Sequence, residues 1–535
     1  MMTLTQRFDR RSFLKQLAMV AIAMSLSAEC YPAAPGARKK PNIIVILSDD
    51  IGFGDISSYG ATHVHTPRID SMAAEGLRFI DAHSDAATCT PSRYALLTGS
   101  YAWRRDGIQV LPGDANLLID PQKPTVASEL KSADYVTGLV GKWHVGLGDG
   151  EIDWNGEIKP GPREVGFDEA FFFSATADRV PTVYVQDRHV VNLDPNDPIF
   201  VSYGKKIGTD PTGKEDPDLL KMKLSEGHDG TIVDGISRIG FETGGNAARW
   251  KDEEMAQTFT AKAVDFIEKN QHKPFFLYFA PSDIHVPRAP APQFAGKNEC
   301  GVRCDVIDQL DWSVGQVLDT LKRLHLEEDT LVLFTSDNGP VVNDGYDDGS
   351  DRKLDGHKPA GPFRGGKYTI FEGGTTVPLM VRWKGHVKAG VSNALVSQVD
   401  LLASFAALVH QPVPAGSAID SQNVLPALLG KSLHGRDSLI EEAQVLAIRE
   451  GKWKLIDRSQ RPGAVPRPAP PANQKDAAGD ILRAYPTAPL ELYDISVDPG
   501  EIKNLAAQYP DIVERLRSKL AQTRAVANRN GHSTS

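Results

Sequence analysis

Two continuous apolar runs constrain the fold of this chain most strongly, and each run ends directly in residues with side-chain oxygens. The runs, with the residues that follow them, are 42–48 with Asp49 and Asp50, and 330–336 with Asp337 and Asn338. A short apolar run without alternation predicts a strand that is buried on both faces, as in a sheet covered by helices on both sides. Functional sites in such sheets lie at the carboxyl ends of the strands.

Three carboxylates and one amide oxygen form a ligand set that suits Ca²⁺ or Mg²⁺. For a single Asp-Asp pair, solvated loop acids are the more common outcome, because Asp is mostly exposed in folded proteins. The second copy of the arrangement favours a metal site instead. We therefore expect Asp49, Asp50, Asp337 and Asn338 to bind a divalent cation.

Other parts of the chain alternate between strand and helix patterns. Apolar runs at 135–140 and 274–280 predict two further buried strands. Pro67 and Pro124 stand where helices would begin, since proline fits the first turn of a helix. This alternation predicts an α/β domain over residues 41–430.

The C-terminal residues, 431–535, have a different pattern. Short apolar segments at 444–449, 453–456 and 491–495 predict a small antiparallel sheet. Apolar residues at helical spacing predict a closing helix at 510–527. We therefore expect a smaller α+β subdomain at the C-terminus.

A cysteine stands at the start of another predicted helix. Pro91 follows Cys89 by two residues and could open the helix, and Arg93 lies on its first turn. A helix N-terminus favours negative charge, so a nucleophile at Cys89 would meet an anionic substrate with Arg93 as its partner. On burial statistics alone, a structural cysteine in front of an ordinary helix is the alternative.

This segment, C-T-P-S-R followed by L-T-G, resembles the signature of the type I sulfatases. The resemblance implies that a formylglycine-generating maturation enzyme oxidises Cys89 and that the hydrated aldehyde attacks sulfur. It implies that the modified Cys89 also binds the metal. It implies an alkaline-phosphatase-like α/β fold, with a large mixed sheet sandwiched by helices and a smaller C-terminal antiparallel sheet plus helix.

Two further segments, G-K-W-H-V-G and R-G-G-K, also resemble sulfatase motifs. By this resemblance Lys142 and Lys367 bind sulfate, and His144 contacts the diol. The family also has a histidine near the leaving oxygen, which makes His285 the candidate general acid. Taken alone, an isolated Lys is often a snorkelling side chain, and a His after a strand is more often structural.

Two segments have the composition of variable regions. Residues 149–249 are rich in Asp, Gly and Pro, and residues 461–489 form a Pro/Ala-rich stretch that predicts a surface insertion. Asp178 and Arg179 lie side by side in the first segment. They could bind neighbouring sugar hydroxyls or form a structural ion pair.

His357 and Lys358 lie in the Gly- and Asp-rich loop before the R-G-G-K motif, where they either reach substrate or are solvated. Three segments resemble bacterial exo-acting carbohydrate sulfatases, especially those for the 6-O-sulfate of galactose or N-acetylgalactosamine: the loop with Asp178 and Arg179, residues 283–287 and the predicted helix at 308–315. We therefore expect a sulfated carbohydrate as the substrate.

Charge composition limits the classes of partner. The chain has 535 residues, is 41% hydrophobic and carries a net charge of −10. Such an acidic balance argues against nucleic acid as a partner. An anionic substrate therefore needs a local group of cations, which Arg93, Lys142 and Lys367 would supply with the metal.

Residues 1–34 resemble a twin-arginine export signal. Arg10 and Arg11 precede a short apolar run at 17–26, which is too short to span a membrane. Glu29 fits a lipoprotein signal at the next residue poorly, so we expect no stable membrane anchor. The twin-arginine machinery would place the protein in the periplasm or outside the cell.

Two cysteines four residues apart, Cys300 and Cys304, could form a local disulfide in an oxidising compartment. A zinc site is disfavoured, because neither has a second Cys or His pair at metal spacing.

The sequence thus predicts a formylglycine-dependent sulfatase. Two alternatives stay open: a phosphonate or phosphate monoester hydrolase of the same superfamily, and a sulfated-glycan binding protein in which Cys89 is not converted.

Overall fold

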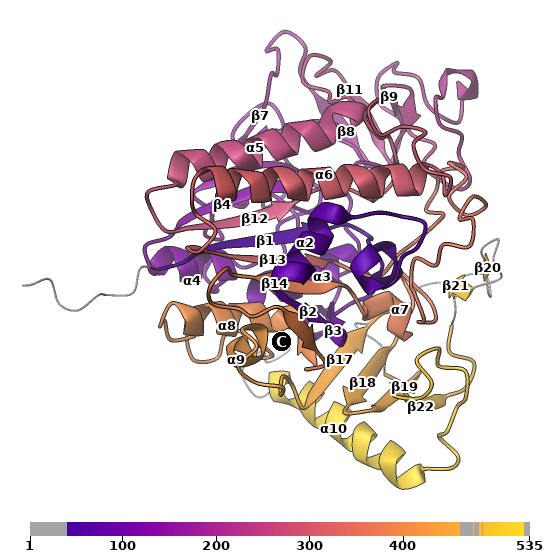
Figure 1. Ribbon diagram of the computed structural model, residues 1–535. Helices are drawn as coiled ribbons and strands as arrows, with labels where there is room; N and C mark the ends of the chain where they lie inside the picture. Colours follow the sequence, from indigo (N-terminus) through magenta and orange to yellow (C-terminus); the bar gives the residue numbers. More distant parts are fainter. Residues whose placement is uncertain (1–39, 461–473, 476–480, 484, 529–535) are drawn as a thin grey trace, which may run out of the picture. The chain divides into compact units, whose positions relative to one another are not determined.

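The predicted apolar runs form the centre of a ten-stranded mixed sheet in the computed structural model (Figure 1). The structure describes residues 40–460, 474–475, 481–483 and 485–528. The predicted export signal and most of the predicted insertion lie outside these residues. In spatial order the strands are β15 (Gly390–Ser392), β2 (Leu77–Phe79), β14 (Leu379–Arg382), β13 (Thr330–Ser336), β1 (Asn42–Ser48), β12 (Phe275–Ala280), β4 (Val136–Lys142), β5 (Glu169–Phe173), β6 (Val185–Gln186) and β7 (His189–Val190).

The central strands β13, β1, β12, β4 and β5 are all parallel. β14 runs antiparallel to β13, and β6 runs antiparallel to β5, which makes the sheet mixed. In the register, Ser48 at the end of β1 lies opposite Ser336 at the end of β13. The residues that follow these two strands therefore emerge side by side at one edge of the sheet.

Helices cover both faces of the sheet, as the apolar runs predict. Ile44 and Ile46 of β1 pack with the helices α2 (Pro67–Glu75), α5 (Met255–Asn270) and α6 (Val302–Arg323). Val45 and Leu47, on the opposite face, pack with α3 (Cys89–Thr98), α4 (Val126–Ser132) and α8 (Leu401–Leu408). Alternate residues of β1 enter different cores. A shift of the strand register by one residue would therefore move each side chain into the opposite core.

A second, four-stranded antiparallel sheet is formed near the C-terminus. Its strands are β17 (Ser438–Glu442), β18 (Leu446–Glu450), β19 (Trp453–Asp457) and β22 (Leu490–Asp494), and α10 (Pro510–Asn528) packs on it. Strand β17 is not predicted by the sequence analysis. Ala95 of α3 joins the apolar core of this sheet, whereas Leu96 and Leu97 enter the core of the large sheet. Helix α3 therefore packs against both sheets.

Smaller elements complete the described part of the chain. Paired short strands are β8 (Phe200–Ser202) with β11 (Phe241–Thr243), β9 (Ile232–Val233) with β10 (Ile236–Ser237), β3 (Ala82–His83) with β16 (Val396–Ser397), and β20 (Gln474–Lys475) with β21 (Ile481–Arg483). Two helices of one turn are α7 (Glu372–Thr375) and α9 (Leu425–Leu428). No helix in the described ranges combines the length and apolarity needed to cross a membrane.

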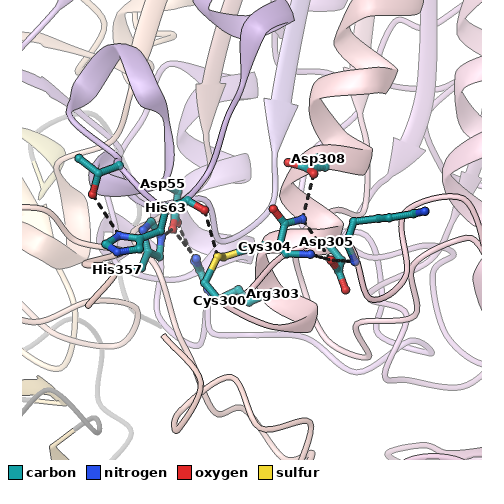
Figure 2. The surroundings of a disulfide bond; sticks show 11 residues. Asp55, His63, Cys300, Arg303, Cys304, Asp305, Asp308 and His357 are labelled. Atoms are coloured by element: carbon teal, nitrogen blue, oxygen red, sulfur yellow. Dashed lines mark hydrogen bonds and ion pairs between the residues drawn. A yellow bond between two sulfur atoms is a disulfide. The ribbon is translucent and has the colours of Figure 1, made fainter. Parts of the chain in front are cut away.

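A disulfide joins Cys300 to Cys304 at the start of α6, which resolves the pairing that the sequence left open (Figure 2). Arg303, between these cysteines, is completely buried and forms a two-pronged ion pair with Asp55. Burial raises the pKa of Asp55, but Arg303 and His357 outweigh this effect and hold the pKa below its ordinary value. Asp55 follows the β1 acids closely in the chain, so this ion pair ties their loop to α6.

Replacing Arg303 should destabilise the protein. In Arg303→Met the carboxylate of Asp55 stays buried without its guanidinium partner, and losing one member of a buried pair costs about 3–5 kcal/mol. The expected result is a lower denaturation midpoint in urea. Arg323→Ala, which removes an exposed ion pair with Glu268, should change the midpoint little. An unchanged midpoint in Arg303→Met would show that the ion pair does not stabilise this region.

Candidate active site

Four neighbouring parallel strands deliver polar side chains to one edge of the large sheet. In spatial order, Asp337 and Asn338 follow β13, Asp49 and Asp50 follow β1, His285 follows β12 closely, and Lys142 ends β4. All six side chains are buried. Asp50 has a positive φ of 64°, a backbone conformation that Asp tolerates and that turns the chain sharply after Asp49.

Four buried side chains can each offer one possible metal-ligand atom, and these atoms lie within 4.8 Å of one another. The four residues are Asp49, Asp50, Cys89 and His285. Asn338 donates to the Oδ1 of Asp50 at 2.7 Å, and its own Oδ1 is buried without a partner. An unpartnered buried oxygen beside two carboxylates suits a hard divalent cation. The sequence analysis proposed His285 as the general acid, and the structure also places it among the possible metal-ligand atoms.

Three cations pair with the buried carboxylates at this edge, and Lys142 reaches both Asp49 and, at 3.7 Å, Asp337. The Nζ of Lys142 lies 2.7 Å from Asp49, and the Nζ of Lys367 lies 2.9 Å from Asp50. Arg93 donates through Nε to the Oδ2 of Asp337 at 2.9 Å. These ion pairs join the cations expected to bind sulfate to the acids expected to bind metal.

Burial also shifts the acidity of the site. Burial raises the pKa of Asp49 to about 8, although the neighbouring Lys142 opposes this effect, and Asp337 and Asp50 add to it. A nearby divalent cation would favour the ionised carboxylates again, because opposite charge lowers their pKa.

Cys89 is the first residue of α3, so the thiol lies at the helix N-terminus as predicted. Only 1% of it is exposed. Burial raises the pKa of the thiol to about 11, even though Lys142 and Lys367 lower it. The unmodified side chain is thus a protonated thiol at neutral pH, which is a poor nucleophile.

The two predicted histidines have different surroundings. His144 contacts the carbonyl of Leu111 through Nε2 at 3.1 Å, and its buried Nδ1 has no partner among the described residues. His285 contacts the carbonyl of Val286 through Nδ1 at 2.7 Å, and its Nε2 lies 3.8 Å from Asp50. Burial and nearby cations, Lys142 for both and Lys367 for His285, hold the pKa of both imidazoles well below its ordinary value.

Asp178 and Arg179 form a compact polar group beside this site. Arg179 donates to Asp178 at 2.8 Å, and His228 contacts the other carboxylate oxygen at 2.9 Å. The charge of Arg179 acts on His144, and that of Asp178 acts on His285. Sequence reasoning missed His228, because no motif surrounds it.

His357 and Lys358 are not brought into the group of carboxylates. His357 is buried, and its Nε2 contacts Asp55 at 2.7 Å, next to Arg303 (Figure 2). Lys358 is exposed.

Comparisons with known proteins identify the family. The sulfatase family profile matches residues 41–411 of this chain. The chain belongs to the sulfatase family, and it is a sulfuric ester hydrolase. It is 48% identical over 485 residues to the N-acetylgalactosamine-6-O-sulfatase of Bacteroides thetaiotaomicron, covering 90% of this chain and 93% of that protein. Human arylsulfatase A is 31% identical over 501 residues, covering 91% of this chain and 88% of the human protein.

A solved Bacteroides thetaiotaomicron structure, described in connection with the metabolism of multiple glycosaminoglycans, superposes with a TM-score of 0.86. It shares 48% sequence identity and covers 91% of this chain and 100% of that chain. The large mixed sheet with its small C-terminal sheet is therefore the alkaline-phosphatase-like fold expected from the sequence.

Divalent cations should stabilise this sulfatase. A ligand that binds only the folded state at a concentration a hundredfold above its Kd adds about 2.7 kcal/mol to the free energy of unfolding. We expect Ca²⁺ or Mg²⁺ to raise the melting temperature of metal-free protein, and Asp49→Asn to reduce this gain. Asp347→Asn, which changes an exposed ion pair with Arg352, should keep it. An equal gain in Asp49→Asn would reject Asp49 as a ligand.

Proposed function

We propose that this sulfatase is exported and removes sulfate esters from sulfated carbohydrates, using formylglycine formed from Cys89 and bound Ca²⁺ or Mg²⁺. The observation that carries this proposal is the position of Cys89, which lies at a helix N-terminus among three cations and the candidate metal-binding acids. The preferred sulfate position is the 6-O of galactose or N-acetylgalactosamine, supported by the name of the Bacteroides relative.

The proposed nucleophile is a hydroxyl of the hydrated aldehyde. The buried thiol, whose pKa is about 11, is poorly suited to attack, so a chemical change at Cys89 serves the reaction. One hydroxyl of the diol attacks sulfur and releases the alcohol. The second hydroxyl then loses its proton, which expels sulfate and regenerates the aldehyde, whereas a serine would remain as a sulfate ester.

Arg93, Lys142 and Lys367 are proposed to stabilise the sulfuryl group during transfer. They are completely or almost completely buried, so their charges act at low dielectric and need no reorganisation when the substrate arrives. Asp49, Asp50, Asp337, Asn338 and the modified residue 89 would hold the metal, which would supply further positive charge to the sulfuryl group.

The histidines are proposed to move protons. His285 would protonate the leaving alcohol through Nε2, because its Nδ1 is held by the carbonyl of Val286. Burial and the charges of Lys367 and Lys142 lower the pKa of His285, and the negative charge of a bound sulfate ester would raise it again. The unpartnered Nδ1 of His144 would accept a proton from the second hydroxyl during sulfate elimination.

The group of Asp178, Arg179 and His228 is proposed to bind sugar hydroxyls. Its side chains offer charged hydrogen-bonding groups close to both site histidines, and the short Asp178–Arg179 contact holds them in fixed geometry. Recognition of the sugar is thus separated from recognition of sulfate.

The cellular route is also part of the proposal. The twin-arginine-like segment at 1–34 supports export to the periplasm or beyond, and the disulfide between Cys300 and Cys304 suits an oxidising compartment. A formylglycine-generating enzyme and the twin-arginine machinery would be the partners in maturation.

The state of residue 89 tests the proposed chemistry. Mass spectrometry of the active protein should find the aldehyde in the peptide that contains residue 89, and Cys89→Ala should abolish sulfate release from an aryl sulfate while the protein still folds. An unmodified thiol in a fully active preparation would reject the formylglycine mechanism. Turnover of an aryl phosphate, measured beside that of the aryl sulfate, should stay well below it.

Variants of Asp178 test sugar recognition. A hydrogen bond to a charged group contributes about 1.5–3 kcal/mol, so Asp178→Ala should lower kcat/KM on the sulfated sugar by about ten- to a hundred-fold or more. A small aryl sulfate, which lacks the sugar hydroxyls, should be turned over almost as before. Equal losses on both substrates would show that Asp178 supports the fold or the sulfate pocket instead.

A further inference from the structure

Lys367 is held by two carboxylates that belong to different parts of the site. Its Nζ lies 2.9 Å from the Oδ2 of Asp50 and 2.9 Å from the Oδ2 of Asp344. Asp50 belongs to the candidate metal site, whereas Asp344 lies in the loop that follows β13 and contacts Lys367 and Tyr368. Sequence analysis did not single out Asp344.

The hydrogen bonds to Asp50 and Asp344 use up most of the donors of Lys367. An ammonium group has three N–H donors. In the described residues, Asp50 and Asp344 each accept one of them, which leaves one donor direction. The Lys367 side chain is only 1% exposed, so the remaining N–H group is shielded from open solvent. Its Nζ lies 5.3 Å from the ring centroid of Tyr368, and its charge acts on Cys89.

Asp344 is itself fixed in place. The hydroxyl of Tyr368 donates to its carboxylate, at 3.1 Å from each oxygen. Tyr368 has a φ of 73°, which is unusual for a bulky residue, and its backbone N–H donates to the carbonyl of Ala87 at 2.7 Å. This hydrogen bond attaches the turn at Lys367 and Tyr368 to Ala87, two residues before Cys89.

We propose that Asp344 is a positioning residue, which holds the ammonium of Lys367 so that its remaining N–H group points at the sulfate of the substrate. This inference rests on the proposed function, in which Lys367 binds sulfate. If a bound metal drew Asp50 away from Lys367, Asp344 would still accept a hydrogen bond from the ammonium and hold it in place. Burial raises the pKa of Asp344, but Lys367 and His285 outweigh this effect and hold the pKa below its ordinary value, so both carboxylate oxygens act as hydrogen-bond acceptors.

Two effects of Asp344 on sulfate binding have opposite signs. Its negative charge would repel sulfate, whereas its hydrogen bond to Lys367 would orient the donor that sulfate needs. Misplacement of a binding group by about 1 Å can cost a hundredfold in rate. The proposal requires orientation to outweigh repulsion.

The test compares Asp344→Ala with Asp344→Asn in the full-length, metal-loaded protein. Inorganic sulfate binding is measured by calorimetry, and kcat and KM are measured on an aryl sulfate. We expect Asp344→Ala to weaken sulfate binding and raise KM by about ten- to a hundred-fold. Asp344→Asn keeps an oxygen for Lys367 and should stay within about threefold of the wild type. Asp347→Ala, in the same loop, is the matched control.

Three outcomes would overturn the proposal. Tighter sulfate binding in Asp344→Ala would identify Asp344 as a competing anion. A loss confined to the sulfated sugar, with normal turnover of the aryl sulfate, would make it a sugar contact. A lower melting temperature with unchanged sulfate affinity would leave it a purely structural residue.

A second pair of variants separates this inference from the proposed function. In a Lys367→Ala background, Asp344→Ala should weaken sulfate binding no further, because the residue acts through Lys367. If Lys367→Ala alone leaves sulfate binding unchanged, both the assigned role of Lys367 and that of Asp344 are wrong. If Lys367→Ala weakens binding and Asp344→Ala does not, only the role of Asp344 is rejected.

Discussion

The mutual repulsion of three buried carboxylates is the physical constraint on which this site depends. Parallel pairing of β1 with β13 forces Asp49, Asp50 and Asp337 to one place, away from water. Negative charges buried close together destabilise the folded protein unless cations lie between them. Ion pairs with Arg93, Lys142 and Lys367 offset that repulsion, and on the proposed function the same positive charges would bind the anionic sulfate ester.

Helix α3 links this electrostatic arrangement to the packing of the whole protein. One side of the helix enters the core of the large sheet, and Ala95 enters the core of the small sheet. The segment before the helix is also hydrogen-bonded to β17, since the N–H of Ala87 donates to the carbonyl of Glu442 at 2.8 Å. The C-terminal sheet therefore contributes to the position of Cys89, although it supplies none of the candidate site residues.

The sequence predicted the parts of the site that follow directly from strand ends and motifs. Asp49 and Asp337 were predictable because apolar runs mark buried strands, and parallel strands end together. Contacts between loops were not predictable, since nothing in the local pattern of Asp344 or His228 shows that the fold brings them to Lys367 and Asp178. The ion pair of Asp55 with Arg303 was not predictable for the same reason, since it joins segments far apart in the sequence. Strand β17 was missed because residues before 444 have no clear alternation of apolar and polar side chains.

The double packing of α3 has a consequence for the order of events during biosynthesis. With only 1% of Cys89 exposed, an enzyme that modifies this residue has no access to it once both sheets have closed around the helix. On the proposed function, modification must therefore occur on the nascent or still unfolded chain, in kinetic competition with folding. Conditions that speed folding relative to modification would yield a well-folded but inactive protein, and refolding could not repair it without the maturation enzyme.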